Sequence, residues 1–155
     1  MSDAKAPTET YKASCHCGAF AYTVKTASLA HETTEVVRCN CSICLRNGIY
    51  NIYVPDDDIT FTTGQFADLK SYTFATHSVA HRFCPTCGSS CMARSIRPGF
   101  FDGVSIVNVR MFEGVEVEKL RFKEMDGKSY TKEKAEARVA EIEAEKEKAA
   151  AESGV

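Results

Sequence analysis

The sequence predicts a mainly β protein that ends in a charged α-helix. Short runs of β-branched and aromatic residues recur about every ten residues, which favours an antiparallel sandwich or barrel over a parallel α/β sheet. The chain has eight cysteines, and most of them stand in tight clusters. Nearly all residues from 131 to 152 are Ala, Glu or Lys, which are strong helix formers.

Length and composition favour a single domain with an appendage. The 155 residues are 44% hydrophobic and 26% charged, which is the balance of an ordinary globular protein. We expect a flexible N-terminal tail over 1–10, a zinc-binding β domain over 11–128 and a helical extension over 129–155. Residues 1–11 lack the apolar stretch of a secretory signal, and no run approaches the about 18 apolar residues of a membrane span. The sequence therefore predicts a cytoplasmic protein without membrane contact.

The first predicted strands flank a cysteine pair. Strand character begins near residue 11, and Phe20, Tyr22 and Val24 alternate with smaller residues after the turn at Cys17-Gly18, which predicts a hairpin. A cysteine knuckle is expected over 40–48, where it ends at a glycine. Strands are expected on either side of this knuckle, over 35–39 and 49–54, and the second ends at a proline followed by three aspartates.

The second half of the predicted domain repeats this organisation. A second knuckle, over 84–88, interrupts another series of β-rich segments. Strands are expected over 59–63, 69–74, 79–83, 90–96 and 104–112. In the C-terminal helix the only larger aliphatic residues are Val139 and Ile142, on one narrow face. This pattern predicts a mostly solvated helix that docks by a small stripe, with a partner-binding helix as the alternative.

The spacing of the cysteines favours metal binding over disulfides. A disulfide framework is typical of short secreted chains, whereas pairs one or two residues apart can chelate one tetrahedral ion. All cysteines but Cys91 fall into three clusters, which read Cys15-x-Cys17, Cys39-x-Cys41-x2-Cys44 and Cys84-x2-Cys87. We interpret Cys91 as a small buried hydrophobic residue, with a redox or ligand role as the alternative.

Two of these clusters together predict a structural zinc site. Cys15, Cys17, Cys84 and Cys87 supply four thiolates, which satisfy a structural zinc ion and leave no open position. A glycine follows the last cysteine of each pair, and it would let the chain turn so that backbone N–H groups approach sulfur. The alternative is a set of four buried cysteines without metal.

The third cluster predicts a second zinc site of a different kind. Cys39, Cys41 and Cys44 provide three ligands, and three protein ligands leave one position for water or substrate, as in catalytic zinc sites. Two alternatives remain open at the level of sequence. Three thiols without metal would be redox-active, or a fourth ligand would close the site. The candidates for that ligand are Cys91, His77, His81 and His16.

The motifs together resemble one enzyme family. Over residues 11–120 the chain is similar to the glutathione-dependent formaldehyde-activating (GFA, or CENP-V/GFA) family. The helix after residue 131 is not part of the resemblance. The motifs that carry it are Cys15-His16-Cys17-Gly18, Cys39-Asn40-Cys41-Ser42-Ile43-Cys44 followed by Gly48, and Tyr72-Thr73-Phe74 leading to His81-Arg82-Phe83-Cys84-Pro85-Thr86-Cys87-Gly88.

The resemblance implies a fold and an activity. It implies an Mss4-like fold of short antiparallel sheets stapled by zinc, with two Zn²⁺ per chain in the two cysteine sites described above. It also implies a carbon–sulfur lyase that condenses a small thiol such as glutathione with formaldehyde to S-hydroxymethylglutathione. His81 is the candidate catalytic residue, with His77 as a second choice, because the new alkoxide needs a proton. A half-buried, hydrogen-bonded histidine is the alternative interpretation of His81.

Other functions stay open or are disfavoured. The net charge of −2, with an acidic helix, argues against nucleic acid as a partner. A family enzyme with another small substrate and a non-catalytic, zinc-stapled protein-binding module are the alternative functions, and a homo-oligomer is compatible with the sequence. Five arginines are candidates for substrate carboxylates, although each is more typical of a solvated surface: Arg38, Arg46, Arg82, Arg94 and Arg97.

Overall fold

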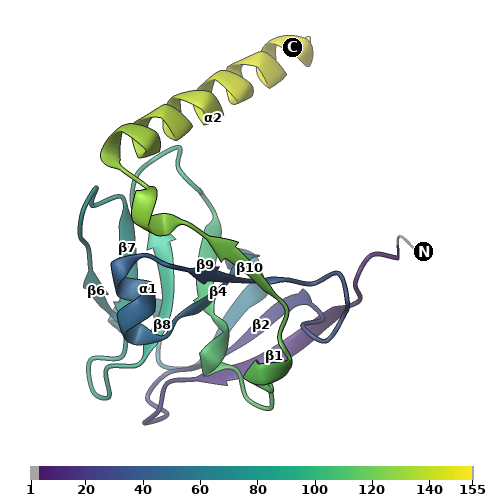
Figure 1. Cartoon of the computed structure of the whole chain (residues 1–155), viewed down its shortest axis with the longest axis vertical. Helices are drawn as coiled ribbons and strands as arrows, with labels where there is room; N and C mark the ends of the chain where they lie inside the picture. The colour runs from purple at the N-terminus through teal and green to yellow at the C-terminus, as the bar shows by residue number, and fades with distance from the viewer. Residues whose placement is uncertain (1–3, 155) are drawn as a thin grey trace.

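The computed structural model describes residues 4–154 and shows two β-sheets with a long helix at the C-terminal end (Figure 1). The three-stranded sheet has the order β1-β2-β5, and the seven-stranded sheet has the order β10-β3-β4-β9-β8-β7-β6. The first sheet contains β1 (Thr8–Ser14), β2 (Ala21–Ala27) and β5 (Ile59–Thr63). The second contains β3 (Val36–Cys39), β4 (Tyr50–Pro55), β6 (Lys70–Tyr72), β7 (Val79–Phe83), β8 (Ser90–Ser95), β9 (Val104–Asn108) and β10 (Phe122–Met125).

The hydrophobic core lies between the two sheets. Tyr22 and Val24 alternate with less buried residues along β2 and are almost fully buried. From the seven-stranded sheet, Val54, Met92 and Val107 belong to the same cluster. One face of the larger sheet is therefore covered by the smaller sheet, and its other face is free for other elements.

The prediction of a mainly β, antiparallel fold is confirmed. The strands run antiparallel at the predicted segments, and the second cysteine cluster includes a short helix, α1 (Ser42–Asn47).

Strand β9 stops at Asn108 rather than at residue 112, because the Asn108 side chain accepts a hydrogen bond from the Arg110 N–H and begins a 3-10 turn. Strand β1 begins at Thr8, inside the segment expected to be a tail, because Thr8 pairs with Ala27. The first three residues of that predicted tail lie outside the described residues.

Strand β10 was not predicted from the sequence. It pairs in parallel with β3, whereas the other strand pairs of the described chain are antiparallel. Its sequence carries two charged residues in four, and one of them, Glu124, pairs with Arg38 of β3. A short, polar edge strand of this kind depends on its partner strand and has no strong signal of its own.

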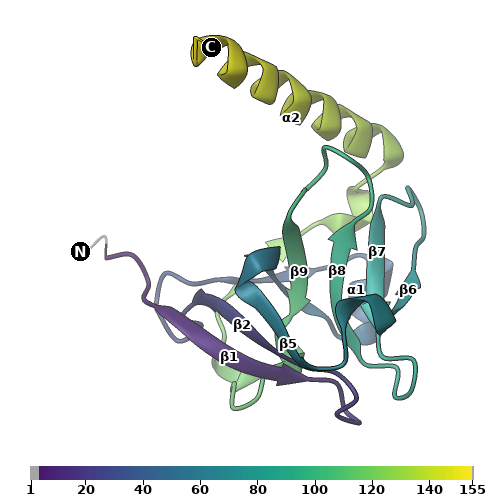
Figure 2. The same cartoon turned by 180° about the vertical axis from the view of Figure 1, so that it is seen from behind.

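The C-terminal helix α2 (Lys132–Glu152) contacts the rest of the chain along its first two thirds, as far as Lys146, which pairs with Asp102 at 3.8 Å. The Thr131 hydroxyl accepts a hydrogen bond from the Lys134 N–H and caps the helix. Ala135 and Val139 are buried, while the rest of the helix extends away from the sheets (Figures 1 and 2). Within residues 4–154, neither helix combines the length and apolar character that crossing a bilayer requires. The division of the chain at residues 128 and 129 stays a prediction.

Candidate metal centres and the adjoining cavity

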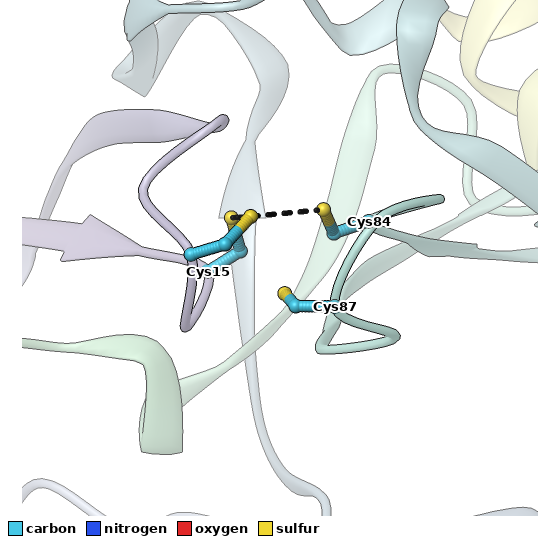
Figure 3. A group of neighbouring side chains, drawn as sticks. Cys15, Cys84 and Cys87 are labelled. Atoms are coloured by element: carbon cyan, nitrogen blue, oxygen red, sulfur yellow. Dashed lines mark hydrogen bonds between the residues drawn. The ribbon is translucent and has the colours of Figure 1, made fainter.

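The first cysteine group joins the two sheets. Cys15 and Cys17 lie in the turn between β1 and β2, and Cys84 and Cys87 lie in the turn between β7 and β8. The four sulfur atoms lie within 4.8 Å of one another. Figure 3 shows Cys15 approaching from one turn and Cys84 and Cys87 from the other, with their sulfurs directed at a common space.

The geometry of this group fits a tetrahedral metal ion. The Sγ atoms of Cys15 and Cys17 are 3.7 Å apart, and the Sγ atoms of Cys17 and Cys84 are also 3.7 Å apart. Four sulfurs at about 2.3 Å from a tetrahedral zinc ion would be about 3.8 Å apart. The donor set and its spacing therefore fit zinc, although these residues' role as ligands stays a prediction.

The two turns orient backbone N–H groups toward the sulfurs. The Phe20 N–H donates to Cys15 Sγ at 3.3 Å. Gly18 and Gly88 adopt φ angles of +78° and +77°, which a residue with a Cβ atom rarely adopts. Hydrogen bonds from the Ser89 side chain and its backbone N–H lower the pKa of Cys87 to about 5. These N–H groups favour thiolates, which are the form that binds a metal ion.

The second cysteine group lies around the start of α1. Cys39 ends strand β3, Cys41 caps the helix and Cys44 lies within it. The three sulfur atoms lie within 4.8 Å of one another, with Cys39 and Cys44 buried and Cys41 half-buried. The knuckle forms because the left-handed Gly48 ends the helix after less than two turns and leads directly into β4.

The hydrogen bonds of this group favour a negative charge on one of its sulfurs, that of Cys41. Hydrogen bonds from the Cys44 thiol and from the backbone N–H groups of Cys44 and Ile43 lower the pKa of Cys41 to about 5. The pKa of Cys44 is raised, because its thiol donates to Cys41 and because it is buried. A cation at this point would let all three sulfurs ionise, so the donor set fits a metal ion as well.

None of the four proposed closing ligands joins the second group within residues 4–154. Cys91 lies near Cys15 and Cys84 of the first group, and burial raises its pKa to about 12. It is completely buried, so the interpretation as a small core residue fits its position. His16 is exposed beside the first group, where its backbone N–H donates to the Ser89 hydroxyl. The second group therefore offers three protein donors.

A cavity of about 1100 Å³ opens beside the second cysteine group. Cys39, Cys41 and Cys44 all line it, whereas the cysteines of the first group do not. The cavity lies on the face of the seven-stranded sheet that the smaller sheet leaves free. Its floor includes neighbouring side chains of β4 and β9, in which Asn51 pairs with Asn108 and Tyr53 pairs with Ile106. The Asn51 amide donates to Cys44 Sγ at 3.7 Å and links this floor to the sulfurs.

The end of β10 and the segment after it form one wall of the cavity. Met125, Asp126, Gly127, Tyr130 and Arg138 line it, and the last two lead into or belong to α2. No pattern in the sequence predicts that these residues line a cavity. Two hydrogen bonds fix the segment against the second cysteine group, from the Asn40 amide to Asp126 and from the Lys128 N–H to the Asn40 side chain, both at 2.8 Å.

Gly127 is in contact with the second cysteine group. A Cβ atom at this position would collide with Cys39 Sγ and lie 3.1 Å from Cys41 Cβ. The Gly127 N–H also hydrogen-bonds to Cys39 and counters part of the rise in its pKa that burial causes. An isolated glycine in a polar segment is the only sequence signal for this contact, and it is a weak one.

His81 is the histidine that faces the cavity. It lies half-buried on β7, and its ring is 5.5 Å from that of Phe74. Burial lowers its pKa, so the imidazole is neutral at pH 7. His77 lies in the preceding loop, outside the cavity lining, and its Nδ1 is hydrogen-bonded to the Thr73 hydroxyl at 2.9 Å.

The structure separates the five candidate arginines. Arg46 and Arg82 line the cavity, and the Arg82 guanidinium lies over the ring of Phe66. The other three arginines do not line the cavity. Arg38 forms an ion pair with Glu124, Arg94 forms an ion pair with Asp56, and Arg97 lies in the loop after β8. Arg138 of α2 joins Arg46 at the cavity and was not among the candidates.

Comparison with known proteins identifies the family. The chain matches the family described as "Glutathione-dependent formaldehyde-activating enzyme" over residues 10–133, so it belongs to the GFA family. The match extends past residue 120 and includes β10 and the wall around Gly127. A crystal structure of a Rhodobacter sphaeroides protein, a structural genomics target, is 30% identical. The alignment covers 72% of this chain and 99% of that chain, with a TM-score of 0.56.

Proposed function

We propose that this chain is a zinc-dependent enzyme that adds a small thiol such as glutathione to an aldehyde, as a carbon–sulfur lyase of the GFA family. The observation that carries the proposal is the placement of three cysteine sulfurs, without a fourth protein donor among residues 4–154, at the edge of a large cavity. We also propose a reducing compartment such as the cytoplasm, because free thiolates need one.

Two zinc ions per chain are part of this proposal. Cys15, Cys17, Cys84 and Cys87 would hold the first ion in a closed site, which has a structural role. Cys39, Cys41 and Cys44 would hold the second beside the cavity. There the ion would supply positive charge that favours the ionised form of a substrate thiol.

The reaction is an addition that conserves all atoms. The thiolate sulfur attacks the carbonyl carbon, a C–S bond forms, the C=O π bond breaks, and the oxygen receives the proton that the thiol has lost. Neutral His81 can accept that proton on a ring nitrogen and return it to the oxygen, directly or through water. Arg46 of α1, Arg82 of β7 and Arg138 of α2 all line the cavity and are the candidates for the carboxylates of glutathione.

The direct test is an assay of adduct formation. Zinc-loaded protein is mixed with glutathione and formaldehyde, and exchange between the free aldehyde and the adduct is followed by NMR against the spontaneous rate. We expect exchange to exceed the spontaneous rate in proportion to enzyme concentration. A rate that stays at the spontaneous value for formaldehyde and for larger aldehydes would contradict the proposed function and favour a non-catalytic module.

The His81→Gln substitution is expected to lower kcat by about 10²-fold or more while both metal sites stay filled, because it removes the proton carrier. His77→Gln is the matched control, since His77 lies four residues away outside the cavity lining. Equal activity of both variants and the unchanged protein would exclude His81 as the catalytic residue.

The Gly127→Ala substitution is expected to weaken metal binding at the second site, because the new methyl group collides with Cys39 Sγ. The zinc content measured by elemental analysis should fall from two ions per chain toward one, and the midpoint of thermal unfolding should change little. Lys128→Ala, an exposed change in the same turn, should retain both ions. Full zinc content in the Gly127 variant would show that this segment is not part of the site.

A further inference from the structure

The large hydrophobic side chains that remain exposed are concentrated at the cavity. Within the described residues, those at the cavity are Tyr53, Tyr72, Phe101, Met125 and Tyr130. Only two others, Leu45 and Ile96, lie outside its lining. Exposed hydrophobic surface that gathers at one concave site indicates an apolar ligand, whereas scattered exposed residues need no explanation.

Aromatic rings form two walls of this cavity. On one side the rings of Tyr53 and Phe101 stack at 6.0 Å, and Phe100 meets Phe101 edge-on at 4.8 Å. On the other side the rings of Tyr72 and Phe74 stack at 5.9 Å. Aromatic walls of this kind are suited to a flat or branched apolar group.

Three of the four charged side chains that line the cavity have hydrogen-bond partners within the chain. The Arg46 guanidinium donates to the Ser42 carbonyl, and the Arg138 guanidinium donates to Glu141. Asp126 accepts hydrogen bonds from Asn40 and from Ser129. The fourth, Arg82, lies over the ring of Phe66, and its buried Nε has no hydrogen-bond partner. The polar side chains gather around the second cysteine group, and the rest of the cavity lining is mainly apolar.

The size of the cavity also favours a ligand larger than formaldehyde. At about 1100 Å³ it is as large as the pockets of about 300–1,000 Å³ that hold drug-sized ligands. Formaldehyde has one carbon atom and no side chain, so it would bury almost no apolar surface on the aromatic walls. A thiol adduct of formaldehyde would leave these walls without a role in binding.

We propose that the aldehyde half of the adduct is apolar and bulky, an aromatic or branched group that binds against the wall of Tyr53 and Phe101, with the reacting carbon at the second cysteine group. This inference rests on the proposed function. The addition keeps the same balance: the C–S bond forms, the C=O π bond breaks, and the thiol proton moves to the oxygen. The larger aldehyde substituent changes the part of the substrate that binds in the cavity and leaves the reaction the same.

The test measures binding rather than turnover. Zinc-loaded protein is titrated calorimetrically with S-benzylglutathione and with S-methylglutathione, which share the tripeptide and differ in the apolar group. We expect the benzyl compound to bind about 10-fold to 100-fold more tightly, the factor that corresponds to burial of an aromatic side chain. Phe101→Ala should remove most of this preference, whereas Ile96→Ala, an exposed apolar change outside the cavity, should preserve it.

Three results would overturn the inference. One is equal affinity for the two compounds, and another is a benzyl preference that Phe101→Ala leaves intact. The third is a concentration-dependent dimer that Phe101→Ala abolishes without any benzyl preference, which would make the aromatic surface an interface between copies of the chain. Because the readout is binding, a benzyl preference in a protein that catalyses no addition would support this inference while contradicting the proposed function.

Discussion

The Cys84→Ser substitution is expected to unfold the β domain at room temperature. Cys84 is completely buried, and it connects the turn after β7 with the turn after β1, through Cys17 at a separation of 67 residues. The four-cysteine group therefore ties the three-stranded sheet to the seven-stranded sheet. Structural zinc sites contribute about 10–16 kcal/mol in small domains, and whole domains are stable by only about 5–15 kcal/mol. The measurement is circular dichroism with zinc content on the same sample.

Cys91→Ala is the control for this experiment. Cys91 is as buried as Cys84 and belongs to the same core cluster, but it is not a member of the metal group. This variant should stay folded with both zinc ions. A Cys84 variant that is folded, soluble and fully zinc-loaded would refute the structural role of the first site.

The Cys41→Ser substitution is expected to remove the second metal and the activity but to leave the fold intact. Cys39 and Cys44 belong to a small hydrophobic cluster with Ile49, apart from the main core that contains Cys15 and Cys84. Loss of the second ion should therefore change the thermal midpoint little, whereas adduct formation should fall by about 10³-fold or more.

The control for the Cys41 variant is Leu45→Ala, which changes an exposed side chain of the same helix α1 outside the cavity. It should retain two zinc ions and activity. If Cys41→Ser released both ions together, the division into a structural and an open site would be wrong.

The strands could be predicted because their signal is local. Tyr22 and Val24 alternate with less buried residues, and this period of two appears in the sequence as clearly as in the sheet. The positions of the cysteine knuckles were also evident, since their ligand spacings are only one or two residues. Glycines at the expected turns adopt the left-handed conformation that those turns require.

The cavity could not be predicted because its lining comes from distant parts of the chain. Phe101 reaches it from a loop, Tyr130 from the end of a 3-10 turn and Arg138 from a helix, and none of them has a motif that marks it. The positions of Tyr130 and Arg138 depend on the parallel pairing of β10 with β3, which carries the C-terminal segment across the second cysteine group. A polar edge strand gives no local indication of its partner.

The measurement that tests the central claim most directly is zinc per chain, combined with X-ray absorption at the zinc edge before and after addition of glutathione. We predict two zinc ions per chain, with an average of about 3.5 sulfur ligands per ion that rises to about 4 when the thiol binds at the open position. One zinc ion per chain, or a sulfur count that glutathione leaves unchanged, would contradict an open, thiol-binding metal site.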